Sequence, residues 1–217
     1  LSMSSQKVIL LSGISANGKT STGADRSSKE FGKYLTPIMT RPIVELRTWA
    51  SAVIVSSTTV IIDNPRLTCK DNPGLVRVVI DRRGLLTLNE YEVLGRSAKT
   101  FIYTSVSDHP LVDLQTVIKV PKQKFLTHVI DDLVKRGFDQ ILVEVGERLG
   151  MAMIDERLVD EIVCGIFPFL VTDPDAPGWM MLSHNQDKRG KVFDAITLKK
   201  TEIIDGAIIA TYRVRYE

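Results

Sequence analysis

Residues 46–70 read LRTWASAVIVSSTTVIIDNPRLTCK. The apolar run Ala52–Val55, rich in β-branched residues, predicts a buried strand of an α/β sheet. Soon afterwards the chain presents a carboxylate, an amide, a proline and two cations within residues 63–70. Open α/β sheets keep their ligand sites at the C-terminal ends of strands. We therefore expect residues 63–70 to be a loop just past a strand and to form part of such a site.

Strands and helices alternate on both sides of this segment. The other predicted strands are Lys7–Ser15, Val76–Ile80, Thr100–Tyr103, Gln140–Gly146, Asp160–Val171, Ile196–Ile204 and Ala207–Tyr216. Asp205-Gly206 is a strong hairpin signal between the last two of these strands. The predicted helices lie within 37–50, from Leu126 to Gly137, and from Gly150 to Glu156.

These patterns predict an α/β protein. We expect one three-layer domain with a mostly parallel central sheet and antiparallel C-terminal strands. In the helix within 37–50, the residues Ile38, Val44, Leu46 and Trp49 are expected to share a face. The polar segment 21–34 predicts a loop, and no Pro/Gly/Ser linker divides the chain, so residues 1–217 predict a single domain. Residues 1–5 are expected to be disordered or tag-derived.

Composition excludes several classes of protein. Among 217 residues, 44% are hydrophobic and 25% charged, and the net charge of +2 is too small to indicate a nucleic-acid partner. Cys69 and Cys164 stand apart from any CxxC or Cys/His cluster, so no metal site or disulfide framework is expected. No apolar stretch approaches the roughly 20 residues of a membrane span. Unpaired cysteines and the absence of a signal peptide at the start predict a cytoplasmic protein.

Four charged residues are candidates for chemistry. Asp63 and Lys70 bound the polar segment, Glu144 ends a predicted strand, and Arg47 ends the preceding helix. For each of them, a solvated or structural role is the competing interpretation, because most charged residues lie at the surface. Glu144 is the hardest to explain structurally. It interrupts the apolar run ILVEVG, and a buried carboxylate needs hydrogen bonds or a raised pKa.

The chain resembles the reductase domain of bacterial RibD/RibG proteins, riboflavin-pathway pyrimidine reductases with a dihydrofolate-reductase-like fold. Residues 46–70 are similar to the family's R…DAILVGxGTVxxDxPxLTxR stretch, and SANGKTS (Ser15–Ser21) to its SLDGK turn. LVEVG stands in place of VEGG, and LVDEIVCGIFPFL in place of LVDEL…APxLxG. The combination of Arg47 with TVxxDxPxLT is the specific part of this resemblance.

The resemblance implies NADPH-dependent reduction of the ribosylamino group of a pyrimidine 5′-phosphate to a ribitylamino group. Asp63 and Glu144 match the family's acidic active-site positions, where a carboxylate can stabilise a protonated imine. Arg47 and Lys70 match positions that hold the substrate phosphate. Pro65 is expected to stiffen the loop, and Leu67 to form its apolar wall.

The resemblance places the cofactor on glycine-rich turns, and this chain departs from those turns. Ser56-Ser57-Thr58-Thr59 replaces the GxGT turn, and the EGG motif keeps Gly146 alone of its glycines. A Cβ can close the gap that a phosphate needs, whereas hydroxyls can substitute as donors. The cofactor-binding residues expected from the resemblance are Asn17, Gly18, Ser57, Thr59, Arg82, Thr104, Ser105 and Gly146.

Three functions stay open at this point. The chain is an NADPH-dependent riboflavin-pathway reductase, a paralogous NAD(P)H reductase of another heterocycle, or a non-catalytic nucleotide-binding module of the same fold. The retained charged residues favour an enzyme, and the missing glycines favour the other two. The resemblance also implies a homodimer formed through the C-terminal strands. The apolar run 207–216 would otherwise be an exposed strand, which invites pairing, although its alternation also allows these residues to face the core of the monomer.

Overall fold

The computed structural model describes residues 6–23, 26–33, 40–87, 90–113, 115–146, 148–179 and 196–216. The chain forms two compact units that are interleaved in sequence. The first comprises Leu1–Val8 and Pro42–Glu144, and the second Ile9–Arg41 and Val145–Glu217. The expectation for residues 1–5 lies outside the described residues. Because each unit is built from two stretches of chain, the single-domain organisation of residues 1–217 stays a prediction.

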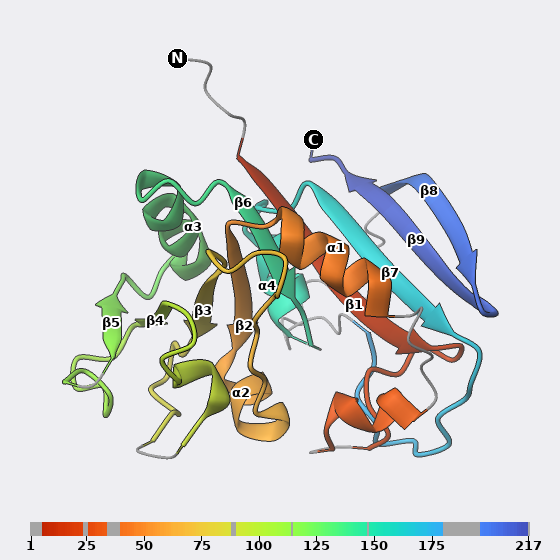
Figure 1. Ribbon diagram of the computed structural model, residues 1–217, viewed down its shortest axis with the longest axis horizontal. Coiled ribbons are helices and arrows are strands. Elements are labelled where there is room, and N and C mark those ends of the chain that lie inside the picture. Colours follow the sequence, from red (N-terminus) through yellow and green to blue (C-terminus); the bar gives the residue numbers. More distant parts are fainter. Residues whose placement is uncertain are drawn as a thin grey trace. The chain divides into compact units, whose positions relative to one another are not determined.

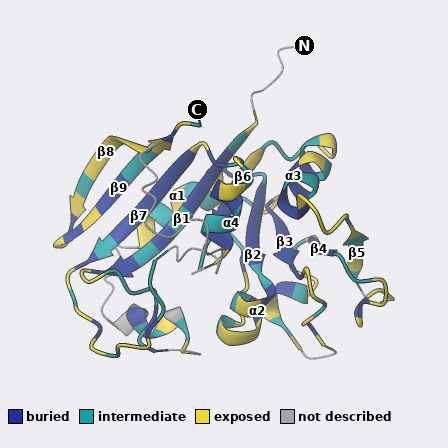
Figure 2. Ribbon diagram, turned by 180° about the vertical axis from the view of Figure 1, so that it is seen from behind, coloured by how far each residue is buried: buried dark blue, intermediate teal, exposed yellow. Residues whose placement is uncertain are grey.

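A parallel sheet forms the centre of the first unit (Figure 1). Its strand order is β5-β4-β3-β2-β6, and every neighbouring pair is parallel. The strands are β2 (Ala52–Ser56), β3 (Val76–Ile80), β4 (Thr100–Thr104), β5 (Thr116–Lys119) and β6 (Gln140–Glu144). Every residue of β3 and β4 is buried, as the dark blue of Figure 2 shows. Continuous apolar runs of this kind are typical of parallel strands covered on both faces.

The helices of the first unit differ in how they are buried. α3 (Phe125–Lys135) turns a buried face of Phe125, Leu126, Val129, Ile130 and Leu133 inward, as its spacing predicts. α1 (Arg41–Trp49) has no buried residue, and Val44, on the face predicted to be apolar, is 43% exposed. Ile38, also assigned to that face, lies outside the described residues. α2 (Ser57–Asp63) and the short 3₁₀ helix η3 (Glu92–Leu94) complete the unit.

The second unit carries the antiparallel strands. Its strand order is β1-β7-β9-β8, with β1 and β7 parallel and the other pairs antiparallel. The strands are β1 (Lys7–Ser15), whose first two residues belong to the first unit, β7 (Glu161–Phe167), β8 (Ile196–Ile204) and β9 (Ala207–Val214). Asp205 (φ 47°) and Gly206 (φ 82°) form the predicted turn between β8 and β9. α4 (Leu149–Asp155) precedes β7, and the 3₁₀ helix η1 (Ser28–Lys33) occupies part of the segment expected to be a loop.

The architecture is the predicted α/β class, with mostly parallel strands and antiparallel strands at the C-terminus. Two elements depart from the sequence prediction. α2 occupies residues expected to be a turn and a loop, and β5 was not predicted at all. Within the described part of the chain, no helix is both long enough and apolar enough to cross a membrane.

Candidate active site

The polar segment begins at the end of a helix, so its expected position directly after a strand is wrong. Ser56 caps α2, because its Oγ accepts the N–H of Thr59 at 3.2 Å. Asp63 is the last residue of α2 and is half-buried. Asn64 then ends the helix with a left-handed backbone (φ 41°), and its N–H donates to the carbonyl of Val60 at 3.0 Å.

The next residues form a loop that contains a buried residue, Leu67, and an exposed one, Lys70. Leu67 is 2% exposed and has a φ of 51°, so its side chain packs inside the protein. Pro65 is half-buried. Lys70 is exposed and makes no hydrogen bond or ion pair with another described residue. Its ammonium group is therefore available to an anion from solution.

Arg47 and Glu144 form a two-pronged ion pair, although they are 97 residues apart in the sequence. Arg47 Nε donates to Glu144 Oε1 at 2.6 Å, and Arg47 Nη2 donates to Oε2 at 2.9 Å. Each side chain is 20% exposed, so Glu144 is less buried than its apolar neighbours predict. The parallel fork geometry fixes the plane of the carboxylate as well as its position.

The environment of Arg47 favours its charged form. Burial works to lower the pKa of the guanidinium, but the hydrogen bonds and the charge of Glu144 outweigh burial, and the pKa is raised. Arg47 Nη1 also donates to the carbonyl of Thr68 at 3.4 Å. The pair thus joins the end of β6 to the loop after α2.

Asn72, which follows Lys70 in the chain after one residue, hydrogen-bonds to the C-terminal end of α1. Its Nδ2 donates to the carbonyls of Arg47 at 3.0 Å, Thr48 at 3.3 Å and Ala50 at 2.7 Å. These carbonyls lie at the end of the helix, where no further turn can satisfy them. The sequence analysis missed Asn72, although Asn72-Pro73-Gly74 is a turn signal.

The hydroxyls expected to replace the family's glycines are used within the protein. The hydroxyls of Ser56 and Thr59 lie 3.0 Å apart and bond to each other. Ser57 is buried and donates to the carboxylate of Asp81. Their hydrogen bonds support the start of α2, so these side chains do not point to an open phosphate site.

Asp81 and His109 form a buried polar pair that the sequence analysis did not identify. His109 Nε2 lies 2.9 Å from Asp81 Oδ2, and their side chains are 1% and 0% exposed. His109 Nδ1 accepts the N–H of Leu111 at 3.1 Å, so Nε2 carries the proton that Asp81 accepts. Asp81 also accepts the N–H groups of Leu85 at 2.8 Å and Leu86 at 2.9 Å. A polar residue directly after the apolar strand β3 was the available signal.

An open hollow of about 410 Å³ lies beside the ends of β4 and β5. It is lined by Ser105, Lys119, Val120, Pro121 and Lys122. Arg82 reaches the same segment, because its Nη2 donates to the carbonyl of Lys122 at 3.2 Å. Ser105 Oγ donates to the carbonyl of Arg82 at 2.8 Å. Thr104, in contrast, is 1% exposed, and its hydroxyl accepts the N–H of Val106.

In the second unit, Asn17 uses its amide on the backbone of Val171. Its Nδ2 donates to the Val171 carbonyl at 2.8 Å, and its Oδ1 accepts the Val171 N–H at 3.1 Å. An ionised aspartate here would have no proton to donate to that carbonyl. Gly18 has a φ of 80°, and among the described residues no atom other than those of the chain neighbours lies within 4 Å of a Cβ placed at Gly18 or Gly146. The space beside both glycines is open, and their part in cofactor binding stays a prediction.

The described residues hold no group of three or more His, Cys, Asp or Glu side chains suited to a metal ion. Cys69 and Cys164 are both free.

Comparison with known proteins identifies relatives along nearly the whole chain. The family model described as the RibD C-terminal domain matches residues 6–207. The chain is 32% identical over 182 residues to the 2,5-diamino-6-ribosylamino-4(3H)-pyrimidinone 5′-phosphate reductase of Methanothermobacter thermautotrophicus, which covers 78% of this chain and 81% of that protein. It is 25% identical over 222 residues to the riboflavin biosynthesis protein RibD of Chlamydia pneumoniae, which covers 95% of this chain and 56% of that protein. The chain therefore spans about half the length of the RibD proteins that it matches.

Solved structures share the fold. A deaminase/5-amino-6-(5-phosphoribosylamino)uracil reductase of Thermotoga maritima has a TM-score of 0.78 at 21% identity, covering 97% of this chain and 57% of that chain. A pyrimidine reductase-like protein of Corynebacterium diphtheriae has a TM-score of 0.80 at 17% identity, covering 98% of this chain and 93% of that chain. The fold is that of dihydrofolate-reductase-like RibD reductase domains, and the family model matches nearly the whole chain. This chain therefore belongs to the RibD C-terminal domain family.

Proposed function

We propose that this chain is an NADPH-dependent reductase that converts the ribosylamino group of a pyrimidine 5′-phosphate into a ribitylamino group. The observation that carries the proposal is the Arg47–Glu144 pair, which sets an oriented carboxylate at the C-terminal end of β6. The names of the relatives supply the substrate class, a phosphorylated ribosylaminopyrimidine.

The acids serve the reacting C=N bond of the ring-opened substrate. That bond takes up a hydride at carbon and a proton at nitrogen, and it becomes the C–N single bond of the ribitylamino product. Positive charge at the nitrogen makes the carbon a better hydride acceptor, and a fixed carboxylate stabilises that charge. Glu144 and Asp63 take this role, and Arg47 fixes the orientation of Glu144.

The substrate phosphate is held chiefly by Lys70. Glu144 occupies the fork of Arg47, whereas the ammonium of Lys70 is exposed. Arg47 retains N–H groups that can add to the phosphate contacts. Lys70→Ala should raise the KM for substrate about tenfold and leave the KM for NADPH unchanged, because a phosphate contact of this kind contributes a charge-assisted hydrogen bond. Equal effects on both KM values would mean that Lys70 contacts the cofactor.

The cofactor is a nicotinamide dinucleotide, which supplies the hydride when it is bound. The residues present fit its phosphate-bearing end, because the hollow beside β4 and β5 combines two lysines with the nearby guanidinium of Arg82. This positive charge favours NADPH over NADH, since NADPH alone carries a phosphate on the adenosine ribose. The double variant Arg82→Ala with Lys122→Ala should weaken the binding of NADPH but not the binding of NADH. An unchanged preference for NADPH over NADH would remove the NADPH assignment.

A second candidate is a nucleotide-binding module without turnover. The observation that favours it is the internal use of the Ser56, Ser57 and Thr59 hydroxyls, which stand where the family pattern has a glycine turn and hydrogen-bond within the protein. Reduction of another heterocycle is a third candidate, and it shares the cofactor with the first.

One experiment separates these candidates. The purified protein is titrated with NADPH and with NADH while nicotinamide fluorescence is followed, and NADPH consumption is then measured with the ribosylaminopyrimidine 5′-phosphate. Binding with turnover supports the proposed reductase. Binding without turnover on this substrate leaves the module or a reductase of another heterocycle, and binding of neither nucleotide removes both reductase functions.

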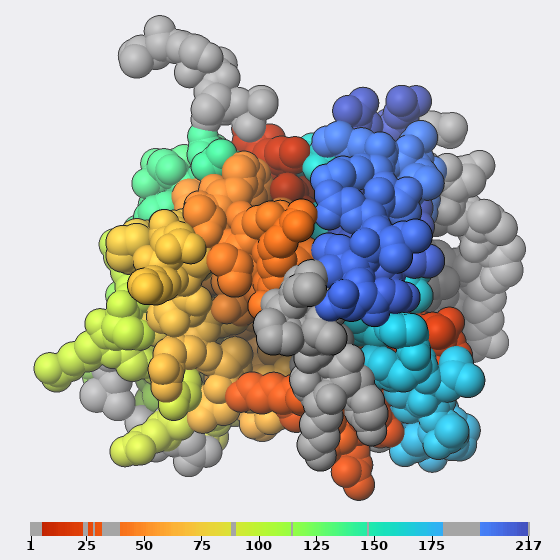
Figure 3. All heavy atoms as spheres, turned by 45° about the vertical axis from the view of Figure 1, so that its right-hand side comes forward, coloured from red at the N-terminus to blue at the C-terminus, as the bar shows by residue number. Residues whose placement is uncertain are grey.

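The proposal includes a cytoplasmic homodimer. Free Cys69 and Cys164 are the cysteine state expected in a reducing compartment. The hairpin β8–β9 supplies the surface for pairing, because β8 is the edge strand of its unit and exposes Ile196, Leu198 and Ile203. Figure 3 shows the atoms of this hairpin, in blue, as a broad face.

A further inference from the structure

Arg77 is a fully buried arginine without an acidic partner. It is the second residue of β3, its side chain is 0% exposed, and no carboxylate of the described residues forms an ion pair with it. Burial alone lowers the pKa of its guanidinium. A charge held in this way must be satisfied by neutral acceptors, since an uncompensated buried charge is strongly destabilising.

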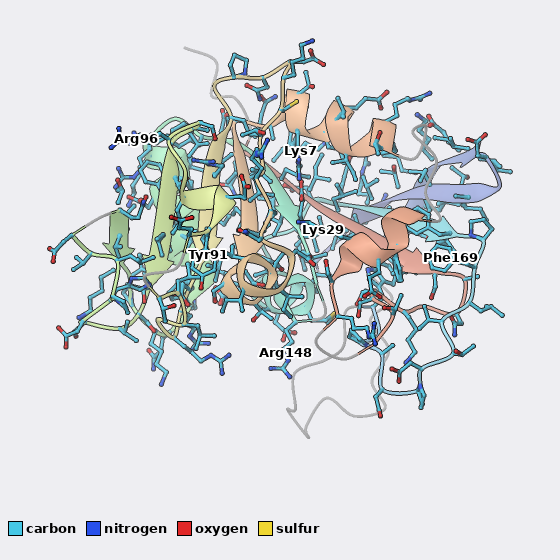
Figure 4. The ribbon with its side chains drawn as sticks, turned by 60° about the horizontal axis from the view of Figure 1, so that its bottom comes forward. Lys7, Lys29, Tyr91, Arg96, Arg148 and Phe169 are labelled. Atoms are coloured by element: carbon cyan, nitrogen blue, oxygen red, sulfur yellow. The ribbon has the colours of Figure 1, made fainter. Side chains whose placement is uncertain are left out.

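Backbone carbonyls of one nearby segment supply most of those acceptors. Arg77 Nη2 donates to the carbonyls of Gly95 at 2.5 Å and Ala98, and Nη1 donates to Ser97 Oγ at 3.1 Å and the Glu92 carbonyl at 3.5 Å. These acceptors belong to residues 92–98, the segment that holds the 3₁₀ helix η3. Figure 4 labels Arg96 in this segment and Tyr91 directly before it.

The same guanidinium also reaches the loop after α2. Arg77 Nη1 donates to the carbonyl of Arg66 at 3.4 Å. Two further contacts join the loop to Glu92, whose backbone N–H donates to Asn64 Oδ1 at 2.8 Å and whose carboxylate accepts Arg66 Nε at 3.0 Å. Arg77 therefore hydrogen-bonds to both the loop after α2 and the segment 92–98, and that segment also contacts the loop through Glu92.

The loop needs such support because its backbone is strained. Asn64 and Leu67 both lie in the left-handed region, with φ of 41° and 51°. A residue with a Cβ is costly there, and for leucine no local side-chain hydrogen bond offsets the cost. Strained residues of this kind persist only where the surrounding structure fixes them, and they gather at functional sites.

We propose that Arg77 is a positioning residue for the reductase: through the carbonyl of Arg66 and the segment 92–98, it holds Asn64–Leu67 in the conformation that presents Asp63 and Lys70 to the substrate. The inference rests on the proposed function of this loop. Arginine suits the task because its planar fork carries five donors, which can meet several carbonyls at once, whereas lysine carries three on a single nitrogen.

The first test compares Arg77→Lys with Arg136→Lys. Arg136 is a matched control, since its Nε pairs with Asp132 at 2.7 Å and no contact joins it to the loop among the described residues. Arg77→Lys should raise the KM for the phosphorylated substrate about tenfold, because lost loop order weakens substrate contacts, while the KM for NADPH changes less than about twofold. Arg136→Lys should leave both KM values unchanged.

Hydrogen exchange provides a readout that does not depend on turnover. In Arg77→Lys, amides of the peptide spanning residues 64–72 should exchange about tenfold faster, and those of α3 should keep their wild-type rates. The loop and the segment 92–98 lose their anchor, whereas in the part of the chain that the structure describes α3 does not contact Arg77 through a hydrogen bond. Equal acceleration in both peptides, or a loop unchanged in exchange and in substrate KM, would overturn the proposal. If the wild type shows no turnover, the proposed function fails, and exchange still decides whether Arg77 orders the loop.

A second pair of variants covers the case in which Arg77→Lys does not fold. Asn64→Asp retains the oxygen that accepts the Glu92 N–H and tolerates the left-handed backbone, whereas Asn64→Ala loses both advantages. Asn64→Ala should raise the substrate KM and loop exchange together, and Asn64→Asp should restore both toward wild type. Identical behaviour of the two variants would show that the junction with residues 92–98 does not position the loop.

Discussion

Arg47 donates to both oxygens of Glu144 and to the carbonyl of Thr68, so one side chain links a strand end to a loop more than 70 residues away from it in sequence. The main partner of Arg47 is thus the carboxylate of Glu144, and under the proposed function a contact with the substrate phosphate is secondary. A carboxylate held by two parallel hydrogen bonds cannot rotate, and orientation is what a group needs if it is to stabilise charge at one substrate atom.

The role of Glu144 leads to the first prediction. Glu144→Gln keeps one acceptor but turns an NH2 group toward the Arg47 guanidinium, so both the negative charge and the fork are lost. We expect kcat to fall about 100-fold or more, the range of a lost acid–base or electrostatic contribution. Steady-state kinetics measure the loss, and thermal melts separate it from unfolding. The exposed Glu90→Gln is the control, and near-normal turnover of Glu144→Gln would exclude the catalytic role.

Asp81 gives a second prediction at the same scale, in the dependence of stability on pH. Burial would raise the pKa of its carboxyl, but hydrogen bonds from Leu86, Leu85, His109 and Ser57 outweigh burial, and the pKa is lowered. The folded-state pKa thus lies below the unfolded value of about 3.9. The stabilisation is therefore complete above that value and is lost as pH falls through the folded-state pKa.

Replacing the carboxylate tests this linkage. Asp81→Asn places an NH2 group among N–H donors, and we expect it to lower the free energy of unfolding by about 1–3 kcal/mol near pH 7. The difference from wild type should shrink below about pH 4, where protonation removes the same charge from the wild type. Chemical denaturation from pH 3 to pH 7 measures it, with the exposed Asp131→Asn as control. A difference that is constant across this range would contradict the assigned shift.

At the scale of elements, α2 shows where local sequence determines structure and where it misleads. Ser-Ser-Thr-Thr occupies the position of a glycine turn in the family pattern, so the resemblance predicts a turn. The same residues carry an N-cap signal that this interpretation overlooks: a serine is followed three residues later by a threonine, and the two are hydrogen-bonded in the structure. β5 was missed for another reason. It has four residues, lies at the edge of its sheet and contains no buried residue, so it carries no burial pattern.

The buried parallel strands were predictable because their apolar runs are long and bounded by turn residues. β1 and β3 match the predicted ranges residue for residue. So does β8, an exposed antiparallel strand that the Asp205-Gly206 turn signal bounds. The candidate site was predictable only as a set of residue types. Nothing local indicated that Arg47 would pair with Glu144, or that Arg77 would hold the Arg66 carbonyl, because both contacts depend on how distant segments pack.

The cap of α2 gives a prediction at this scale. Ser56→Ala removes the oxygen that accepts the Thr59 N–H, and we expect a loss of about 1 kcal/mol in the free energy of unfolding, typical of an N-cap. Thr58→Ala, at an exposed position of the same helix, is the matched control and should change stability by less than about 0.5 kcal/mol. Thermal melts measure both, and equal losses would show that the cap does not contribute.

At the scale of the whole molecule, we expect the C-terminal strands to determine whether the chain pairs with a second copy. Of the two alternatives for residues 207–216, the exposed strand is wrong, because β9 lies between β7 and β8 and hydrogen-bonds to both. The edge strand is β8. Ile203 on β8 is 79% exposed, and its register partner Ile208 on β9 is 41% exposed.

These two isoleucines are directly opposite each other, so they share one face of the hairpin. An edge strand with apolar side chains invites pairing with a second chain unless charge prevents it. We expect sedimentation at micromolar concentration to give a dimer, twice the 24.2 kDa mass of one chain. The double variant Ile203→Lys with Ile208→Lys should shift the protein to the monomer, because four lysines would meet across a two-fold interface. Leu170→Lys, at a residue 70% exposed outside the hairpin, is the control and should leave the dimer intact. A wild type that sediments only as the 24.2 kDa species would contradict the predicted dimer. A dimer that persists in the double variant would place its interface outside the hairpin.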